Sequence, residues 1–241
     1  MGNVKLFCFP YAGTSANAYL QFRERIDEKI TLVPVELSGR GKRFSEGFYP
    51  NMEAAVADVF SKLKEELEGG EYALFGHSMG ALFVFELVHM IQKHGVNPPV
   101  HVFVSGRNPP GIPDDKPKIH RLSDDEFLAE IFRLQGIPKE IEESKEYLEF
   151  FTPIIKADYK LVENYEYDGK KFKVSCGITC LLGQDDLYTN EDVMECWKEF
   201  TARGLAVHKF SGGHFFIFQH LQQIAEVIEH TLLLSGGYSD V

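Results

Sequence analysis

Residues Tyr72–Gly80 have the sequence YALFGHSMG, in which an apolar run ends in the pattern Gly-x-Ser-x-Gly and a helix-like run follows. In this strand–turn–helix context the pattern predicts a nucleophile elbow, a sharp turn that exposes the Ser78 hydroxyl. Gly76 and Gly80 suit such a turn, because a Cβ at either position would collide where strand and helix close on each other. The flanking apolar runs disfavour the alternative of a simple surface Gly-Ser turn.

Strand-like and helix-like segments alternate on both sides of the elbow. Such alternation predicts an α/β fold in which a mostly parallel central sheet is flanked by helices. Pro34 places the second strand toward an edge of that sheet, because proline cannot donate a ladder hydrogen bond. The predicted strands are 4–9, 30–36, 72–77, 100–106, 174–182 and 206–210, and the predicted helices are 18–27, 51–67, 79–94, 191–203 and 216–234.

The stretch 107–167 interrupts this alternation, because its apolar residues recur only at helical spacing. Ser123 and Glu126 have the spacing of a capping box, which starts one helix. A second helix is expected over about 146–165, where Pro153 would kink or divide it. We expect a helical lid inserted into a single domain of residues 1–241. A structural cap without a gating role is the alternative.

Composition restricts the class of partner and the compartment. The formal net charge of -11 argues against a surface for nucleic acid or for an anionic membrane. The start of the chain has no signal-peptide pattern, and no apolar run reaches the ~18–20 residues of a membrane span. We therefore expect a cytoplasmic protein.

The four cysteines do not predict a metal site or disulfides. Cys8, Cys176, Cys180 and Cys196 lack metal-ligand spacing. Cys176 and Cys180 would lie ~13 Å apart along one strand. Buried, reduced thiols are the expected state, and no metal is expected.

A serine hydroxyl becomes a strong nucleophile only when a base takes its proton and a carboxylate orients that base. His214 follows the last predicted strand, and Asp186 follows the strand before it. The order Ser, Asp, His is that of the α/β-hydrolase fold, so we predict Ser78, Asp186 and His214 as the catalytic residues. Asp185 is the alternative acid. His77 is expected to shape the site rather than to transfer protons.

Two backbone amides are predicted to hold the negative charge that develops on the substrate's carbonyl oxygen. The N–H of Met79 lies at the start of the helix after the elbow, where amides point outward. A second N–H should come from the loop after the first strand. We assign it to Ala12, with Tyr11 as the alternative. These residues together predict hydrolysis of an acyl ester or thioester without a cofactor.

Six segments, in order and nearly end to end, resemble the type II thioesterases that accompany nonribosomal peptide and polyketide synthetases. They are Phe9–Gly13, Glu36–Arg43, Phe75–Gly80, Ser105–Pro110, Leu122–Phe127 and Gly212–Phe216. Two positions depart from the pattern of this family. Thr14 stands where a second glycine is usual, and Ser38 stands where a proline is usual.

The resemblance implies an editing thioesterase that removes stalled or wrong acyl and aminoacyl groups from the phosphopantetheine arm of carrier proteins. Carrier domains would be the partner, with no nucleic acid or membrane involved, and we expect a monomer. Because carrier proteins are often acidic, docking should use an apolar patch on the lid. Arg107, Lys116, Lys118 and Arg121 are candidates for local positive charge beside it, although solvated loop residues would have the same pattern.

Three other functions share the predicted fold. One is a thioesterase that ends chain growth by releasing medium-chain fatty acids from a fatty acid synthase. Another is an esterase of small molecules. The third is a carrier-binding module that has lost its chemistry, and the presence of Ser78, Asp186 and His214 argues against it.

Overall fold

The computed structural model describes residues 3–112, 117–133, 144–169 and 172–234. Six strands form one sheet in the order β2-β1-β3-β4-β5-β6, and every neighbouring pair is parallel. This confirms the predicted α/β class and its parallel sheet. The strands are β1 (Val4–Phe9), β2 (Ile30–Pro34), β3 (Tyr72–His77), β4 (His101–Ser105), β5 (Gly177–Gly183) and β6 (Leu205–Phe210).

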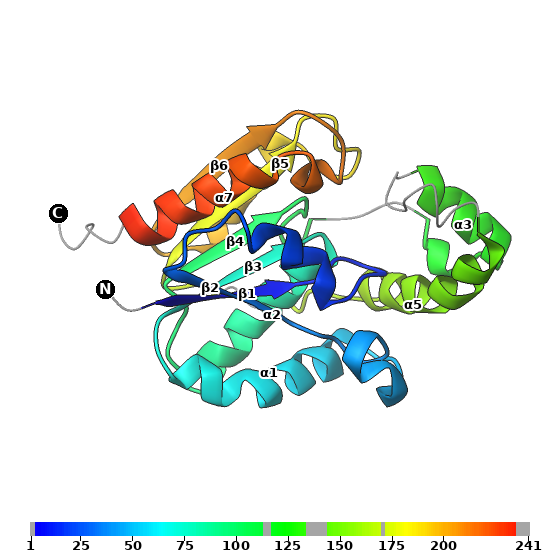
Figure 1. Ribbon diagram of the computed structural model, residues 1–241, viewed down its shortest axis with the longest axis horizontal. Coiled ribbons are helices and arrows are strands. Elements are labelled where there is room, and N and C mark those ends of the chain that lie inside the picture. Colours follow the sequence, from blue (N-terminus) through cyan, green and yellow to red (C-terminus); the bar gives the residue numbers. More distant parts are fainter. Residues whose placement is uncertain (1–2, 113–116, 134–143, 170–171, 235–241) are drawn as a thin grey trace.

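Helices cover both faces of the sheet (Figure 1). On one face α1 (Met52–Glu68) and α2 (Met79–Lys93) pack against one large apolar core. On the other face the 3₁₀ helix η1 (Ala16–Phe22) and α7 (Leu221–Glu229) pack against a second core. Neighbouring strand residues alternate between the two cores, which explains why the central strands are apolar almost throughout.

Several local signals in the sequence have the predicted structural effect. Asn51 caps α1, because its side chain accepts the Ala54 N–H at 2.8 Å. Strand β2, which contains Pro34, lies at an edge of the sheet as predicted. Ser123 and Glu126 form the reciprocal hydrogen bonds of a capping box at the start of α3 (Asp124–Arg133).

Several predicted elements differ from the structure at their ends. The segment expected as helix 18–27 is the shorter 3₁₀ helix η1. The strand expected from 174 begins at Gly177, and Val174 only forms an isolated bridge with Thr201. The helix expected over 191–203 is α6 (Glu191–Glu195) followed by the 3₁₀ turn η4 (Cys196–Phe200).

The predicted final helix 216–234 is divided into three parts. They are the 3₁₀ helix η5 (Phe216–Phe218), then α7, then the π-helical turn η6 (His230–Leu234). The break before α7 falls at His220, whose Nε2 lies 2.9 Å from the Ser211 carbonyl oxygen. This contact ties the start of α7 to the loop after β6, at the place where the helix is interrupted.

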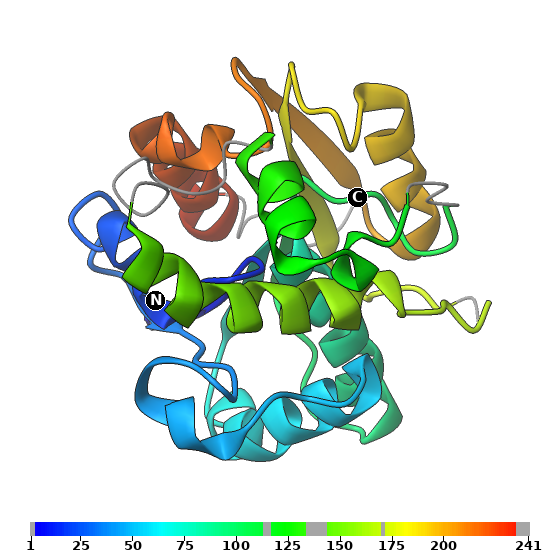
Figure 2. The same ribbon diagram turned by 90° about the vertical axis from the view of Figure 1, so that its right-hand side faces the viewer.

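The helices of the stretch 107–167 lie to one side of the sheet. Figure 2 shows α5 (Lys145–Glu163) crossing the end of the sheet, with α3 packed beside it. Phe127, Ile131 and Ile155 form a small core between these helices. Pro153 lies inside α5 and does not divide it, contrary to one expectation. The 3₁₀ helices η2 (Gly41–Glu46) and η3 (Ile119–Arg121) complete the described elements.

The structure describes two further features that bear on sequence expectations. Cys8, Cys176 and Cys180 are buried free thiols, whereas Cys196 is exposed. No helix in the described parts of the chain is long and apolar enough to cross a membrane.

We expect the stability of the fold to depend on pH through His101, at the start of β4. Its Nε2 lies 2.8 Å from the Thr179 hydroxyl, and burial lowers the pKa of its imidazole from 6.5 to about 4. Between pH 6.5 and 4 the His101 imidazole therefore binds a proton in the unfolded chain but not in the folded chain. The free energy of unfolding falls as the pH falls through this range. At pH 4.5 the burial of His101 should lower the free energy of unfolding by about 2–3 kcal/mol, because each unit of difference between the folded and unfolded pKa is worth ~1.4 kcal/mol.

Urea unfolding at pH 7 and pH 4.5 measures this contribution. The wild type should lose about 2–3 kcal/mol more free energy of unfolding between these pH values than His101→Gln does. Equal losses in the two proteins would show that His101 titrates alike in the folded and unfolded chains.

Candidate active site

Strand β3, Ser78 and helix α2 form the sharp turn that the motif predicted. Ser78 has φ 54° and ψ −114°, and it is the one non-glycine residue with positive φ in the described ranges. The two glycines of the motif lie in direct backbone contact. A Cβ on Gly76 would lie 2.1 Å from the Gly80 carbonyl oxygen, and a Cβ on Gly80 would lie 2.1 Å from the Phe9 carbonyl oxygen. The strained serine conformation is therefore held by close packing of β1, β3 and α2.

Gly80→Ala is expected to destabilise the fold strongly. The new methyl group would meet the backbone oxygens of Phe9, at the end of β1, and of Pro10, which follows it. These oxygens cannot move alone, so the free energy of unfolding should fall by about 4 kcal/mol or more. Gly204→Ala is the matched control, because a Cβ there has no atom within 4 Å and the change should cost under about 1 kcal/mol. Thermal unfolding compares the two variants, and equal melting temperatures would contradict this account of the elbow.

The loops after β5 and β6 bring an acid and a histidine together. The Asp186 Oδ2 and His214 Nδ1 atoms lie 2.8 Å apart, and the Asp186 side chain is fully buried. Its other oxygen, Oδ1, accepts the Tyr188 N–H at 2.8 Å. Among the described residues, Asp185 makes no hydrogen bond to His214. Its Oδ2 accepts the Gly212 N–H at 3.3 Å, which closes the loop that carries His214.

The His77 ring packs against the His214 ring. Its ring centroid lies 4.9 Å from that of His214, and its Nδ1 lies 2.9 Å from the Ser105 hydroxyl oxygen. Burial, and secondly the nearby His214, lower the pKa of His77 well below its usual value. The geometry agrees with the prediction that His77 shapes the site.

Gly106, just after β4, lets the two histidine rings approach the sheet. Its φ is +59°, and a Cβ there would lie 2.7 Å from His77 Cε1 and 3.3 Å from His214 Cε1. Any side chain at this position would therefore push both rings away from their observed places.

The loop after β1 turns tightly at Tyr11–Thr14. The Tyr11 carbonyl oxygen accepts both the Thr14 N–H, at 3.3 Å, and the Thr14 hydroxyl, at 2.9 Å. Gly13 has φ +83°, the value that a type II turn requires at its third residue. Thr14, which departs from the family pattern, thus closes the turn with its side chain. Ser38, the other departure, donates its hydroxyl to the Gly47 carbonyl oxygen at 2.6 Å.

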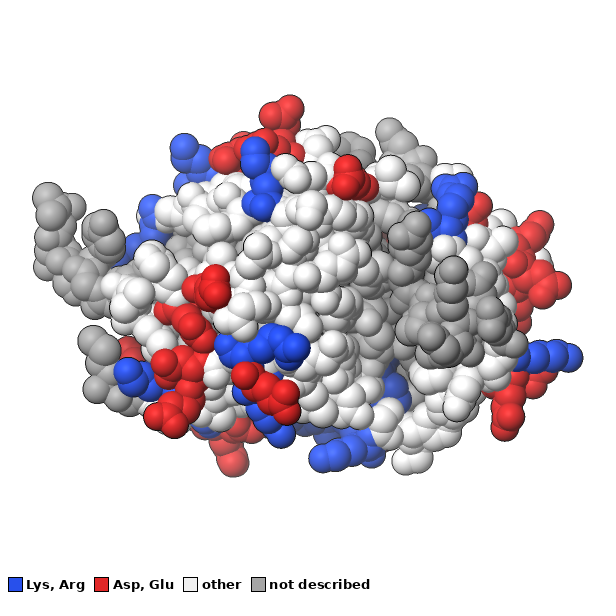
Figure 3. Space-filling model, turned by 45° about the horizontal axis from the view of Figure 1, so that its top comes forward, with Lys and Arg blue, Asp and Glu red and all other residues white. Residues whose placement is uncertain are grey.

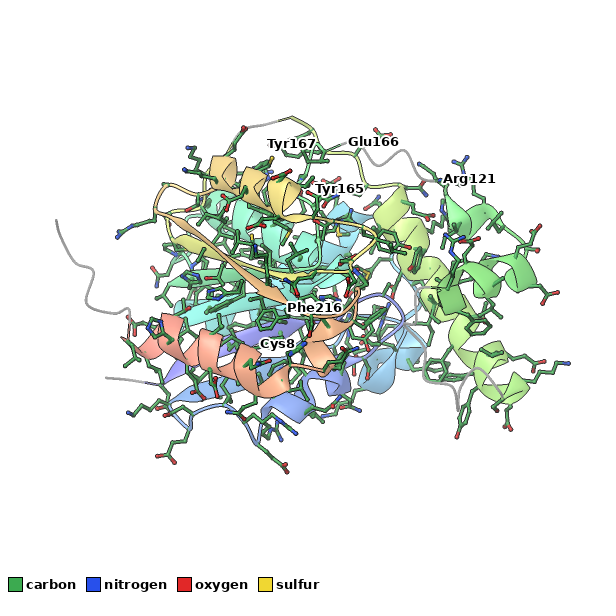
Figure 4. The ribbon with its side chains drawn as sticks, turned by 90° about the horizontal axis from the view of Figure 1, so that it is seen from above. Cys8, Arg121, Tyr165, Glu166, Tyr167 and Phe216 are labelled. Carbon is green, nitrogen blue, oxygen red and sulfur yellow. The ribbon has the colours of Figure 1, made fainter. Side chains whose placement is uncertain are left out.

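A cavity of about 850 Å³ connects these residues. Ser78, His214, Met79 and Ala12 all line it, and Tyr11 does not, which favours Ala12 as the second amide donor. The lid and its flanking segments supply most of the remaining wall. Figure 4 shows Tyr165, Glu166 and Tyr167 together in the segment after α5. The predicted oxyanion donors thus share one cavity with the predicted nucleophile and base.

The cavity wall carries tyrosine hydroxyls and balanced charge. Burial raises the pKa values of Tyr159 and Tyr165, so both hydroxyls stay neutral. The Tyr165 hydroxyl donates to the Glu86 carboxylate, and Glu163 accepts N–H bonds from Ile119 and His120. Three basic and three acidic residues line the cavity: Arg107, Lys118, Arg133, Glu130, Glu163 and Glu166.

Sequence reasoning missed two residues that hold the site. Tyr188 donates its N–H to Asp186, and its ring centroid lies 5.3 Å from that of His214. Asp158 is a buried carboxylate on α5. It lies on the same helix face as Ile154, Ile155 and Leu161, so a charged residue among apolar ones was the signal available in the sequence.

Two of the predicted lid charges lie in the cavity wall. Arg107 and Lys118 line the cavity, and the Lys118 ammonium donates to the Asn164 side chain at 3.0 Å. Arg121 lies on the lid (Figure 4). Lys116 lies outside the described residues. Within the described ranges, no cluster of three or more histidine, cysteine or acidic residues could hold a metal ion.

Comparison with known proteins defines the class of this fold and site. A family model described as "Thioesterase domain" matches residues 4–232, so the chain belongs to the thioesterase domain family. It is 36% identical to linear gramicidin dehydrogenase LgrE of Brevibacillus parabrevis, covering 95% of this chain and 88% of that protein. It is 34% identical to the gramicidin S biosynthesis protein GrsT of Aneurinibacillus migulanus, covering 92% and 86%.

A solved structure shows the same fold. The crystal structure of ClbQ from the colibactin NRPS/PKS pathway matches with a TM-score of 0.92 and 37% identity, covering 96% of this chain and 97% of that one. These findings confirm the predicted α/β-hydrolase fold and the resemblance to the type II thioesterases of nonribosomal peptide and polyketide pathways. The protein is a thioesterase by family.

Proposed function

We propose that the protein hydrolyses the thioester between a stalled or wrong acyl or aminoacyl group and the phosphopantetheine arm of a carrier protein. The observation that carries this proposal is the shared cavity: Ser78, His214, Met79 and Ala12 line it, and Asp186 pairs with His214 beside it. The relatives named above support the biosynthetic setting.

In the proposed mechanism His214 takes the proton of the Ser78 hydroxyl through Nε2 as the hydroxyl oxygen attacks the thioester carbonyl. The buried Asp186 carboxylate keeps the His214 proton on Nδ1 and stabilises the imidazolium that forms. The N–H groups of Met79 and Ala12 hold the oxyanion, and each should be worth ~3 kcal/mol of barrier.

The thiol of the arm then leaves with the proton from His214, and Ser78 is left acylated. Water, deprotonated by His214, attacks this ester, and the acid product and the free hydroxyl are formed. The steps use only side chains and amides of this chain, so no cofactor is proposed.

The cavity suits a long, thin and uncharged arm. The hydroxyls of Tyr159 and Tyr165 are neutral, and the basic and acidic residues of the cavity wall balance in number, so the cavity offers no strong field of either sign. Figure 3 shows charged side chains of both signs along the edges and at both ends of one face of the molecule, with fewer over its middle. Because the overall charge is -11, docking on an acidic carrier protein would rely on local contacts rather than on the field of the whole molecule.

Carrier proteins as partners, a monomeric enzyme and a cytoplasmic location are parts of the same proposal. The lid role of α3 and α5 also belongs to it. Their place over the cavity fits a cover that excludes water while the acyl group is transferred.

Acyl-chain profiling separates editing from the release of finished fatty acids. Acetyl, aminoacyl and octanoyl groups would be compared on a carrier protein and on free pantetheine. The proposal expects cleavage of the acetyl and aminoacyl groups, faster from the carrier than from pantetheine. A sharp optimum at octanoyl, with acetyl untouched, would favour a medium-chain fatty acyl thioesterase. Equal rates on simple esters would favour a general esterase, and no cleavage at all would favour an inactive carrier-binding module.

A further inference from the structure

The lid helix α5 contacts the turn that carries Ala12. The Asp158 Oδ2 atom accepts the Gly13 N–H at 2.8 Å. One turn earlier on the same helix, Ile155 packs against Gly13 so closely that a Cβ on Gly13 would lie 2.5 Å from Ile155 Cγ1. Two side chains of the lid therefore meet the residue that directly follows the proposed oxyanion donor.

Arg40, in the loop after β2, holds Asp158 in place. Its Nη1 and Nη2 lie 2.5 Å and 2.6 Å from the two carboxylate oxygens of Asp158, and both side chains are only 4% exposed. Nη1 also donates to the Thr14 carbonyl oxygen at 3.3 Å. The ion pair thus holds the turn from two sides, at the Gly13 N–H and at the Thr14 carbonyl.

The burial of this pair points to a role in positioning. A buried ion pair is weak evidence for stability, because removing both charges from water costs about as much as their attraction returns. Within the described part of the chain, Arg40 Nε is also buried without a hydrogen-bond partner. What the pair does supply is position. Asp158 holds the Gly13 N–H and Arg40 holds the Thr14 carbonyl oxygen, so the turn that carries Ala12 is tied to α5 and to the loop after β2.

We propose that Asp158, oriented by Arg40, is a positioning residue that couples the seating of the lid helix to the oxyanion site. When α5 is seated, Asp158 and Arg40 hold the Tyr11–Thr14 turn in the place where the Ala12 N–H, which belongs to the Tyr11–Ala12 peptide, faces the oxyanion. When α5 is displaced, the turn loses its acceptor. This inference rests on the proposed function, because it takes Ala12 as an oxyanion donor.

The test uses a double variant, Arg40→Met with Asp158→Leu, which replaces the ion pair by apolar side chains of similar size and removes the acceptor for Gly13. A second double variant, Arg40→Gln with Asp158→Asn, removes the charges but keeps an amide oxygen for the Gly13 N–H. Lys156→Met is the control on the same helix, because the contacts of Lys156 are with Asp124, the Leu122 carbonyl and the Phe127 ring, and not with the Tyr11–Thr14 turn.

The main readout is the rate constant at which a fluorophosphonate labels Ser78, followed by intact mass. The phosphonyl oxygen must occupy the oxyanion site, so this rate does not depend on which acyl group is the natural substrate. We expect labelling at least tenfold slower in the Met/Leu variant, within threefold of wild type in the Gln/Asn variant, and unchanged in Lys156→Met. On acetyl-pantetheine, kcat should fall at least tenfold in the Met/Leu variant while KM changes less than twofold.

Melting temperatures show whether each variant is folded. A folded Met/Leu variant that labels at the wild-type rate overturns the proposal. If that variant does not fold, Asp158→Ala is measured with and without formate, which can supply a carboxylate at the vacated place. We then expect slow labelling that formate accelerates, and fast labelling without formate would also overturn the proposal. A wild type that labels rapidly but cleaves no carrier thioester would instead count against the proposed substrate.

Discussion

Replacing Ser78 by Ala is expected to reduce kcat/KM for an acetyl thioester by about 10⁴-fold or more. The alanine lacks the oxygen that attacks the carbonyl, and neighbouring groups in the cavity cannot replace it with the same strained, exposed geometry. Stopped-time thiol release from acetyl-pantetheine measures the loss. The substitution should leave the fold intact, because it removes one atom from a side chain that faces the cavity.

Ser211→Ala is the matched serine control. The Ser211 hydroxyl lies 3.1 Å from His220 Nε2 on the surface of the loop that leads to His214, so its loss should change kcat/KM by less than about threefold. A Ser78→Ala variant that keeps more than a tenth of wild-type activity would show that another group carries the acyl transfer.

Replacing Asp186 by Asn is expected to reduce kcat by about 10³–10⁴-fold. The Tyr188 N–H needs an acceptor at the Oδ1 position, so the single amide oxygen of the introduced asparagine should stay there. The amide NH₂ group then faces His214 Nδ1 and donates to it. The hydrogen of the His214 ring must then sit on Nε2, and a protonated Nε2 cannot accept the proton of Ser78.

Asp185→Asn is the control for this change. Asp185 accepts only the Gly212 N–H at 3.3 Å among the contacts of its side chain in the described residues, and an amide oxygen can take its place. We expect activity within about threefold of wild type. Comparing kcat of Asp186→Asn and Asp185→Asn shows which acid orients His214. If Asp185→Asn were the variant with the large loss of activity, Asp185 would have that role.

The sequence predicted the parts of the site that depend on local geometry. Gly-x-Ser-x-Gly after an apolar run predicted the strained turn, because only glycines permit the backbone contacts found at Gly76 and Gly80. The positions of His214 and Asp186 followed from the rule that side chains at the carboxyl ends of parallel strands meet at one edge.

The sequence could not predict contacts between segments far apart in the chain. Asp158 meets Gly13 across 145 positions and Arg40 across 118, so no local pattern indicates either bond. Asp185 and Asp186 also have equal local propensity, and the structure separates them through Tyr188 and Gly212. The ends of η1, η4 and η5 were missed because short 3₁₀ turns follow from tertiary contacts rather than from periodicity.

Intact mass of both proteins after a rapid acid quench tests the central claim most directly. Wild-type enzyme is mixed with an acetyl-loaded carrier protein, and Ser78→Ala is run beside it. We predict that the carrier loses its acetyl group only with the wild type, and that an early quench finds one acetyl group on the enzyme peptide that contains Ser78. A carrier that keeps its acetyl group with the wild type, or loses it equally fast with Ser78→Ala, would contradict the account.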